Sequence, residues 1–459
     1  MRSGIRVAWP LAVSGFLPPQ CDGTEWPSPG TGGSAGAETG GAATITGGTN
    51  GETGGTNGET GGTNGETGGT NGETGGTNGE TGGFGGSGGV GASGGALPAV
   101  DEPVLGCSAG VWPEVATYEA LPISPFRGGP DTITDLSANG KVVVGYATHY
   151  DANYTNTSYH PIRFDGSSWK TVFTEARSRT AVVNCDGSVV AAGYDGLRAF
   201  IKRTGQPPVI VVGKGQWATV PRGISADGTR IVGNLEYRGD SWTGFGMDPV
   251  VWTDLGVARY LWPAEPRMAL HITFDGGLIA GLTDHCNYPE PAASCGQPEH
   301  LFTSTGRPNE TLYPGAPATV MSSDGSTFAD SVLDPTSDPY DEKFLVRLFR
   351  PSEGLTTLPC PRGSCEVVGL SSRGNILLVA GPSPHASAGG PFLWTQRHGF
   401  RRLADILAVD GVRVHYIRYT VRGLSDDGRV IVGHGFAPPA SGPRDYIPFR
   451  ITLPRKAYE

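Results

Sequence analysis

The sequence predicts an all-β protein, a seven-bladed β-propeller preceded by a disordered glycine-rich spacer. Three observations lead to this prediction. A short turn-and-strand motif recurs seven times in residues 107–459, further short strands follow each copy, and the strand that would complete the last copy stands before the first. Seven similar units in one chain are typical of a repeat architecture.

Residues 1–21 predict an export signal. They read MRSGIRVAWPLAVSGFLPPQC, two arginines followed by an apolar run that is too short to span a bilayer. In a lipoprotein, Cys21 would be lipidated and would tether the chain to a membrane. Small residues are expected before such a cysteine, but Pro18, Pro19 and Gln20 stand there. A plain secretion signal and a misassigned start codon remain the alternatives.

Residues 22–106 predict a flexible spacer. The unit GGTNGET repeats in tandem from Gly47 to Thr81 and contains no apolar residue, so burial cannot offset the entropy of ordering. The spacer holds ten acidic residues and no Lys or Arg, in a chain whose net charge is −10. Residues 107–459 are therefore close to neutral, and no basic surface for nucleic acid is expected.

The repeated motif is a hairpin, as in GISADGTRIVG (Gly223–Gly233). An apolar residue, a short polar residue and usually Asp or Asn precede a glycine, and a β-branched strand follows it. Short polar side chains hydrogen-bond nearby backbone, and Asp-Gly or Asn-Gly favours a tight turn. A second glycine often ends the strand, which indicates that other backbone lies close to that position. The turn glycines, 41 to 54 residues apart, are Gly140, Gly187, Gly228, Gly276, Gly325, Gly374 and Gly428.

Each repeat predicts four short strands, a to d, but the last one ends after strand c near Ile451. The segment VATYEALPI (Val115–Ile123) resembles the missing strand d. A closed ring needs such an arrangement because the N-terminal strand then completes the last sheet and covers its edge. A pair of β-sandwiches is the alternative, but it does not explain seven equal units.

The pattern G-[IL]-S-x-D-G-x-x-[IV]-V-G, followed by P-F-L-W or A-F-I, resembles the HAF-type extracellular repeat of bacterial surface and secreted proteins. The resemblance covers nearly all of residues 107–459. The letters HAF are absent, and Arg198–Phe200 (RAF) comes nearest. The resemblance implies export and a propeller-like repeat fold, and it implies no defined activity.

Seven cysteines fit an exported protein with disulfides. The predicted pairs are Cys286 with Cys295 and Cys360 with Cys365, and Cys107 with Cys185 is a third candidate. This leaves Cys21 alone. Seven reduced thiols are the alternative, while the spacing around Cys286 matches no common zinc site.

The long b–c loops are the expected binding surface, because function on rigid scaffolds concentrates in variable loops. Their aromatic residues suit carbohydrate or protein surfaces, unless they only pin the loops. Arg222 and Arg422, equivalent in their repeats, would line the central channel and meet an anion, or else serve as ion-pair partners. The aromatic candidates are Tyr150, Tyr154, Trp242, Tyr288, Tyr340 and Tyr446.

Catalytic and metal signals are few. No histidine pair has metalloprotease spacing, and Asp-Gly is expected to be structural, so no catalytic residue, cofactor or metal site is predicted. A weak Ca²⁺ candidate is the acidic cluster with Asp334, Asp338 and Asp341, for which a solvated loop is the alternative. The sequence therefore favours an exported, surface-tethered bacterial binding module of unidentified partner. A polysaccharide-active hydrolase or lyase, and a structural surface protein without a ligand, are the alternatives.

Overall fold

The computed structural model divides by its contacts into residues 1–95 and residues 96–459, and all described elements lie in the second part. In the described residues no helix is long and apolar enough to cross a membrane. The described residues are 107, 110–122, 124 and 131–459, except 151–156, 174–177, 194–197, 213–217, 239–244, 254–257, 262–266, 284–298, 304–318, 338–342, 364, 382–389, 415–417 and 437–445.

The described residues form seven antiparallel sheets, called sheets 1 to 7 in chain order. Sheet 1 contains β2 (Asp131–Leu136), β3 (Val143–Tyr150), β4 (Thr157–Phe164) and β5 (Trp169–Thr171); sheet 2 contains β6 (Ala181–Val183), β7 (Val189–Gly193), β8 (Arg198–Arg203) and β9 (Val209–Val212). Sheet 3 contains β10 (Ala218–Ile224), β11 (Arg230–Arg238), β12 (Phe245–Thr253) and β13 (Ala258–Tyr260); sheet 4 contains β14 (Arg267–Ile272), β15 (Leu278–Thr283) and β16 (Glu299–Thr303).

The last three sheets follow the same order along the chain. Sheet 5 contains β17 (Val320–Met321), β18 (Phe328–Leu333), β19 (Phe344–Arg350) and β20 (Gly354–Pro359); sheet 6 contains β21 (Glu366–Leu370), β22 (Ile376–Ala380), β23 (Phe392–Thr395) and β24 (Gly399–Arg402). Sheet 7 contains β25 (Arg418–Leu424), β26 (Val430–Phe436), β27 (Tyr446–Thr452) and, from the other end of the chain, β1 (Thr117–Ala120). The helical segments are α1 (Leu403–Val409) and the 3₁₀ turns η2 (Pro361–Gly363) and η4 (Arg455–Ala457).

Strand β1 is the outer strand of sheet 7. It pairs antiparallel with β27, and the pairing runs from Thr117 opposite Thr452 to Ala120 opposite Phe449. The guanidinium of Arg450 donates to the Glu119 carboxylate at 3.0 and 2.5 Å. The pairing expected from the sequence for residues 115–123 is therefore present over these four residues.

Seven hydrophobic clusters of the described residues each lie between two neighbouring sheets, and sheets 7 and 1 count as neighbours. Val142, just before β3, and Val144 in β3 pack with sheet 2, whereas Val143 packs with Val430 of sheet 7. This alternation follows from the two-residue period of a strand, and both faces are buried because a sheet lies on either side. Further clusters join sheets 2 and 3, 3 and 4, 4 and 5, 5 and 6, and 6 and 7.

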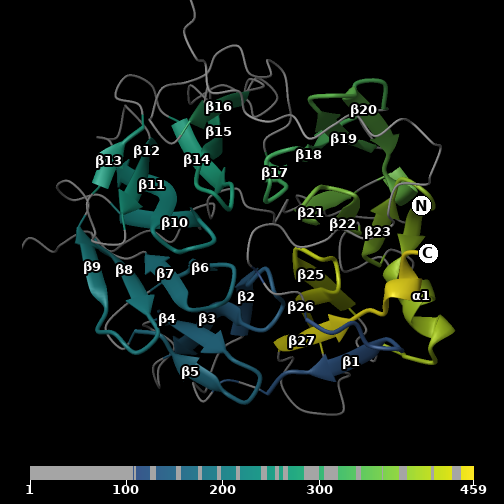
Figure 1. The fold of residues 1–459 in the computed structure, drawn as a ribbon, viewed down its shortest axis with the longest axis horizontal. Coiled ribbons are helices and arrows are strands. Elements are labelled where there is room, and N and C mark those ends of the chain that lie inside the picture. Colours follow the sequence, from purple (N-terminus) through teal and green to yellow (C-terminus); the bar gives the residue numbers. More distant parts are fainter. Residues whose placement is uncertain are drawn as a thin grey trace, which may run out of the picture. The chain divides into compact units, whose positions relative to one another are not determined.

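The first strand of each sheet is its innermost strand. The labels β2, β6, β10, β14, β17, β21 and β25 lie around a common centre within residues 107–459 (Figure 1). Each of these strands contacts the next one in chain order, and β25 contacts β2. The centre is therefore bordered by one strand from each sheet.

The seven a–b turns share one hydrogen-bond pattern. The side chain of the short polar residue accepts from the backbone N–H five residues later, at 2.8–3.0 Å, in all seven turns. In sheet 3 the Asp227 carboxylate also accepts from the Ser225 hydroxyl and from the Thr229 N–H. This confirms the structural role that the sequence predicts for the Ser-x-Asp-Gly motif.

The turns also hydrogen-bond one another. In each turn the residue before the Asp, or a residue next to it, donates a hydrogen bond to a backbone carbonyl of the next turn. The last of these bonds runs from the turn of sheet 7 back to the turn of sheet 1. The bonds are Asn139 N–H to Cys185 O, Asn184 Nδ2 to Ala226 O, Ala226 N–H to Phe274 O, Phe274 N–H to Ser323 O, Asp324 N–H to Ser372 O, Ser372 N–H to Asp426 O and Asp426 N–H to Ala138 O, at 2.8–3.2 Å. We call these seven turns the turn ring.

The disulfide between Cys107 and Cys185 fills the middle of the turn ring. Its Cα atoms are 5.8 Å apart, and both residues are buried among Ala138, Ala226 and Phe274, which occupy equivalent positions in three other turns. A second disulfide joins Cys360 and Cys365 across η2. The predicted pair Cys286–Cys295 lies outside the described residues. The Cys107 disulfide thus occupies the turn end of the centre.

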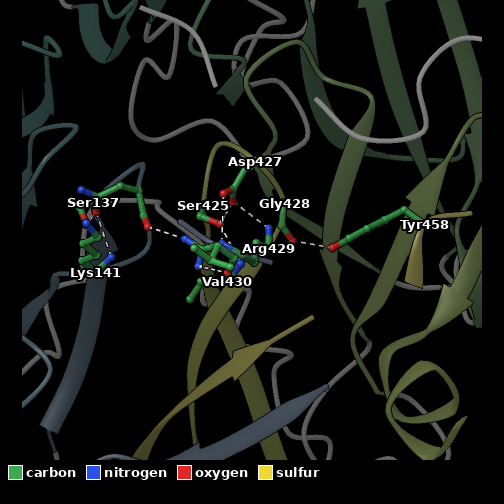
Figure 2. A network of polar contacts seen from close by, with 10 residues as sticks. Ser137, Lys141, Ser425, Asp427, Gly428, Arg429, Val430 and Tyr458 are labelled. Atoms are coloured by element: carbon green, nitrogen blue, oxygen red, sulfur yellow. Dashed lines mark hydrogen bonds and ion pairs between the residues drawn. The ribbon is translucent and has the colours of Figure 1, made fainter. Parts of the chain in front are cut away.

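Arg429 joins the turn of sheet 7 to the turn of sheet 1. Its guanidinium donates to the Asn139 carbonyl at 2.9 Å and to the Val111 carbonyl at 3.2 Å, and it pairs with Asp427. Figure 2 shows this network and, beside it, the Tyr458 hydroxyl donating to the Gly428 carbonyl at 2.5 Å. Both ends of residues 107–459 are therefore fastened at the same turn.

Turn glycines are required for two reasons, which two substitutions can separate. Gly187 and Gly205 both have a positive φ, of 83° and 78°. A Cβ on Gly187 would lie 2.3 Å from Val142 of sheet 1, whereas a Cβ on Gly205 would meet nothing within 4 Å. In urea unfolding, we expect Gly205→Ala to cost about 1 kcal/mol and Gly187→Ala roughly 1–3 kcal/mol more. Equal losses would contradict the inter-sheet contact.

The two disulfides should differ in their contribution to stability. The sequence separations are 78 residues for Cys107–Cys185 and 5 for Cys360–Cys365. In the chain-entropy description, removing them by paired Cys→Ala substitutions should cost about 4.5 and about 2 kcal/mol, respectively. Urea unfolding of the two double variants measures this. A larger loss for the short loop would show that native packing and not chain entropy dominates.

Candidate functional site

The end of the centre opposite the turn ring is bordered by the starts of the innermost strands, and the long b–c loops that follow the second strands lie largely outside the described residues. The candidates Tyr154, Trp242, Tyr288 and Tyr340 lie outside the described residues. Two others stand where strands meet this end, Tyr150 as the last residue of β3 and Tyr446 as the first of β27. Only the backbone of these two is described, so their role as binding residues stays a prediction.

Arg222 and Arg422 stand at equivalent bulges of two innermost strands. In β10 the register shifts between Pro221 and Gly223, and Arg222 is the extra residue. In β25 the shift falls between Val421 and Gly423, around Arg422. A bulged residue leaves the ladder, so its side chain can be directed differently from its neighbours. Both arginines are half-buried.

Two ionisable groups near Arg422 have strongly shifted pKa values. Burial raises the pKa of Glu366, the first residue of β21, to about 6, although the positive charge of Arg422 acts against this shift. Burial also lowers the pKa of His434 in β26 to about 3, and Arg422 lowers it further. At neutral pH this side of the centre therefore holds a neutral imidazole, a carboxylate and a guanidinium.

His271 and Asp135 connect neighbouring innermost strands. Each follows the bulge of its strand, where β10, β21 and β25 have a glycine. The His271 Nε2 lies 2.6 Å from the Thr319 carbonyl, and Asp135 accepts from the Val183 N–H at 2.8 Å. The next innermost strands, β6 and β17, are the two shortest among the described ones. These side chains therefore bond to the backbone of the next innermost strand, or of the residue just before it.

Their environments fit this connecting role. Burial lowers the pKa of His271, and a nearby arginine lowers it further, so the ring is neutral and its Nε2–H donates to the carbonyl. Burial raises the pKa of Asp135 to about 7, although two backbone N–H groups oppose this shift. Sequence reasoning missed both residues, because the equivalent positions in three other repeats hold glycine and the repeat pattern therefore gives these positions no polar role.

Sheet 5 contains a buried ion pair in place of a strand-b glycine. Asp330 stands where Gly145 and Gly433 stand in sheets 1 and 7. Arg347 donates to its two carboxylate oxygens at 2.9 and 2.5 Å. In sheet 1, a Cβ on Gly145 would meet the Thr132 carbonyl of the innermost strand at 2.0 Å. In sheet 5, the innermost strand β17 pairs over two residues only, so the Asp330 side chain does not meet such a carbonyl. This pair is structural.

Aromatic residues meet an arginine where sheets 1 and 2 adjoin at the long-loop end. The Arg179 guanidinium carbon lies 4.2 Å from the centre of the Tyr159 ring, and an Arg179 Nη donates to the Tyr159 hydroxyl at 2.6 Å. The Tyr146 ring stands edge-on to Tyr159, with centroids 5.6 Å apart. Sequence reasoning missed this group, although four tyrosines from Tyr146 to Tyr159, in and around one loop, were a usable signal.

The Ca²⁺ candidate is only partly described. The Asp334 carboxylate accepts from the backbone N–H and the hydroxyl of Thr336, which is a local turn, and Asp338 and Asp341 lie outside the described residues. Within the described part of the chain, no group of three His, Cys, Asp or Glu side chains could hold a metal. Hollows of about 540 and 330 Å³ lie beside the outer strands of sheets 6 and 5; the second is lined in part by Asp334, and neither is lined by Arg222, Arg422 or Glu366.

No family model and no curated protein matches this sequence. Among solved structures, an oligogalacturonate lyase in complex with manganese is similar with a TM-score of 0.48 and 12% identity, over 75% of this chain and 98% of that chain. TolB from Acinetobacter baumannii has a TM-score of 0.37 and 12% identity, over 58% and 63% of the two chains. Similarities of this size carry no inference about ligand or activity.

Glu366 should make stability pH-dependent. Its pKa is about 6 in the folded chain and 4.5 without the fold, so the unfolded chain releases this proton first as the pH rises. The wild type should therefore lose melting temperature relative to Glu366→Gln between pH 4.5 and 6, and the difference should level off above that range. Calorimetry from pH 4 to 8 tests this, and a pH-independent difference would contradict it.

Proposed function

We propose that residues 107–459 form a seven-bladed β-propeller closed by β1, within an exported, surface-tethered binding module. The fold proposal is supported by seven antiparallel sheets in the described residues, by the packing of sheet 7 on sheet 1, and by a turn ring whose hydrogen bonds return to their start. Closure by an N-terminal strand removes exposed edges, the main weakness of open sheets. Membership of the HAF-type repeat family belongs to the same proposal.

Export is supported by the two disulfides and by the leader and spacer predicted from the sequence. The first described residue, Cys107, lies in the middle of the turn ring. In this proposal the spacer joins the folded residues at Cys107, and a lipid on Cys21 is the tether.

The observation that carries the binding proposal is the difference between the two ends of the centre. The turn end is occupied by the turn ring and the Cys107–Cys185 disulfide, whereas partly exposed arginines and tyrosines stand toward the long-loop end. A ligand of carbohydrate or protein character would bind there, since aromatic and arginine side chains dominate such surfaces.

A second candidate function, a polysaccharide-active hydrolase or lyase, is favoured by Glu366. A carboxyl with a pKa of about 6 beside an arginine has the properties of a general acid at near-neutral pH. Hydrolases of this kind use a pair of carboxyl groups, and Glu366 supplies one, so the binding function is preferred. Loss of reducing-end release in Glu366→Gln with retained ligand binding would reverse that preference.

The binding proposal can be tested with the full exported chain on an array of glycans and surface proteins. Two variants carry a bulky insertion, one in the 437–445 loop and one at Gly166, in the c–d turn on the turn side. We expect the first to lose ligand and the second to keep it. If the 437–445 variant kept the ligand and the Gly166 variant lost it, the binding surface would lie at the turn end, which would contradict the proposal.

The closure proposal predicts a cooperative effect of β1. Deleting Thr117–Ala120 leaves β27 as an unpaired edge and removes the partner of Arg450. We expect a lower melting temperature in a single transition, with faster hydrogen exchange in sheets 1 and 6 as well as in sheet 7. Loss of protection confined to sheet 7 would mean that β1 stabilises one sheet only.

A further inference from the structure

Strand β20 gives sheet 5 an outer edge unlike those of the other described outer strands. It is six residues long, reads GLTTLP and carries no charged side chain. The outer strands β1, β5, β9, β13 and β24 have only three or four residues. Four of these carry Lys, Arg or Glu, and β9 directly follows Pro207 and Pro208. Short length, charge and proline keep a strand edge from pairing with another chain, and β20 has only a proline at its last residue, Pro359.

The outer edge of β20 offers unpaired backbone. In the described residues β20 pairs with β19 only, and its label lies on the side of sheet 5 away from the common centre (Figure 1). In the register of these two strands, the Cys360 N–H donates to the Phe344 carbonyl at 3.2 Å. Hydrogen-bonded pairs alternate along an antiparallel ladder, so Leu355 and Thr357 direct their N–H and C=O groups away from β19. These groups are placed to bond a further strand.

The side chains of β20 suit a neighbouring strand without charge. Leu355 is 51% exposed, and Thr356 and Thr357 beside it are exposed as well. The hairpin that precedes the strand is charged, but its Arg350 and Glu353 pair with each other at 3.0 Å. The edge therefore presents apolar and hydroxyl groups, and it matches a strand of the same composition.

A second copy of β20 is such a strand. If two copies pair antiparallel with Leu355 opposite Thr357 of the second copy, every outward N–H and C=O of these residues gains a partner. A register that uses Pro359 would lose bonds because proline has no N–H. The same register places Thr356 opposite Thr356 of the second copy, and threonine pairs across strands are favourable. We propose that β20 is the interface of a homodimer in which two copies of sheet 5 join edge to edge.

This kind of interface determines the assembly that it forms. The contact is isologous, so it closes at two copies. A single pair of strands buries less than the roughly 1,200–2,000 Å² of a stable interface, so we expect a weak, reversible dimer. Tethering to one membrane would raise the effective concentration of the copies, and two loop ends could then engage one ligand together. The inference goes beyond the proposed function, because the pairing needs no ligand.

Charge placement tests the pairing on the full chain without ligand. Analytical ultracentrifugation of the wild type should show a reversible monomer–dimer equilibrium in the micromolar range. Thr356→Lys and Thr356→Glu should each weaken it at least tenfold, because like charges then face each other, and an equimolar mixture of the two should form a heterodimer. Thr356→Val should change it less than threefold. Ile210→Lys, at an exposed position of the outer strand β9, is the matched control and should dimerise like the wild type.

The backbone register is tested by two further substitutions. Thr357→Pro removes an N–H that points away from β19, so sheet 5 keeps its own bonds while the dimer should weaken at least tenfold. In an oxidising buffer, Thr356→Cys should form a disulfide between two copies because it faces itself, and Leu355→Cys should not, because it faces Thr357. Melting temperatures identify any variant that is unfolded. Recovery of a heterodimer from the two charged variants keeps the test valid, since it requires folded chains.

Three results would overturn the inference. They are a wild type that stays monomeric at millimolar concentration, a dimer that Thr356→Lys and Thr357→Pro leave intact, and charged variants that do not associate when mixed. A monomeric chain whose β20 edge takes up a strand of another protein would also overturn it, with a foreign partner in place of the second copy. The proposed function is judged separately by ligand binding in the loop variants.

Discussion

The hydrogen bonds of the turn ring are the constraint on which the rest of the structure depends. At the turn end of the centre, each innermost strand runs out, and the backbone groups of the turn have no neighbouring strand to pair with. Buried backbone groups need partners, and here each turn finds them in the next turn. A partner for the last turn exists only if the first turn lies beside it. The number of repeats, their spacing and the contact of Asp426 with Ala138 are therefore coupled.

The turn could be predicted from the sequence because its causes are local. The polar side chain, the Asp and the positive-φ glycine all act within six residues; the polar side chain and the glycine recur in all seven turns, and the Asp in five. Repeat 6 shows how far the pattern tolerates change. Arg373 replaces the Asp, yet the Ser371 hydroxyl still accepts from the Ile376 N–H. The hydroxyl and the glycine are thus sufficient to fix the turn.

Other features depend on contacts between repeats, and these were not predictable. The bulges of the innermost strands have no sequence signature of their own, and they decide where Arg222 and Arg422 lie. The pKa of Glu366 is raised by burial, and this burial arises only when the sheets pack together. The long loops carry the sequence-predicted aromatics, but what fixes a ring is a contact such as that of Arg179, which lies 20 residues from Tyr159 and enters from the next sheet.

The irregular repeats show which positions can vary while the hydrogen bonds of the turn ring are kept. Asp135 and His271 stand where other sheets have glycine, and they hydrogen-bond to Val183 in β6 and to Thr319, just before β17. Sheet 5 further replaces a crowded glycine with the Asp330–Arg347 pair. The Asp330–Arg347 pair lies on the loop side of the bulge position, whereas Asp135 and His271 stand directly after the bulges, between the bulge and the turn. All seven turns keep the positive-φ glycine and the polar side chain that accepts from the N–H five residues later. The repeated turn therefore sets the register at one end, while the side chains from the bulge outward differ between repeats.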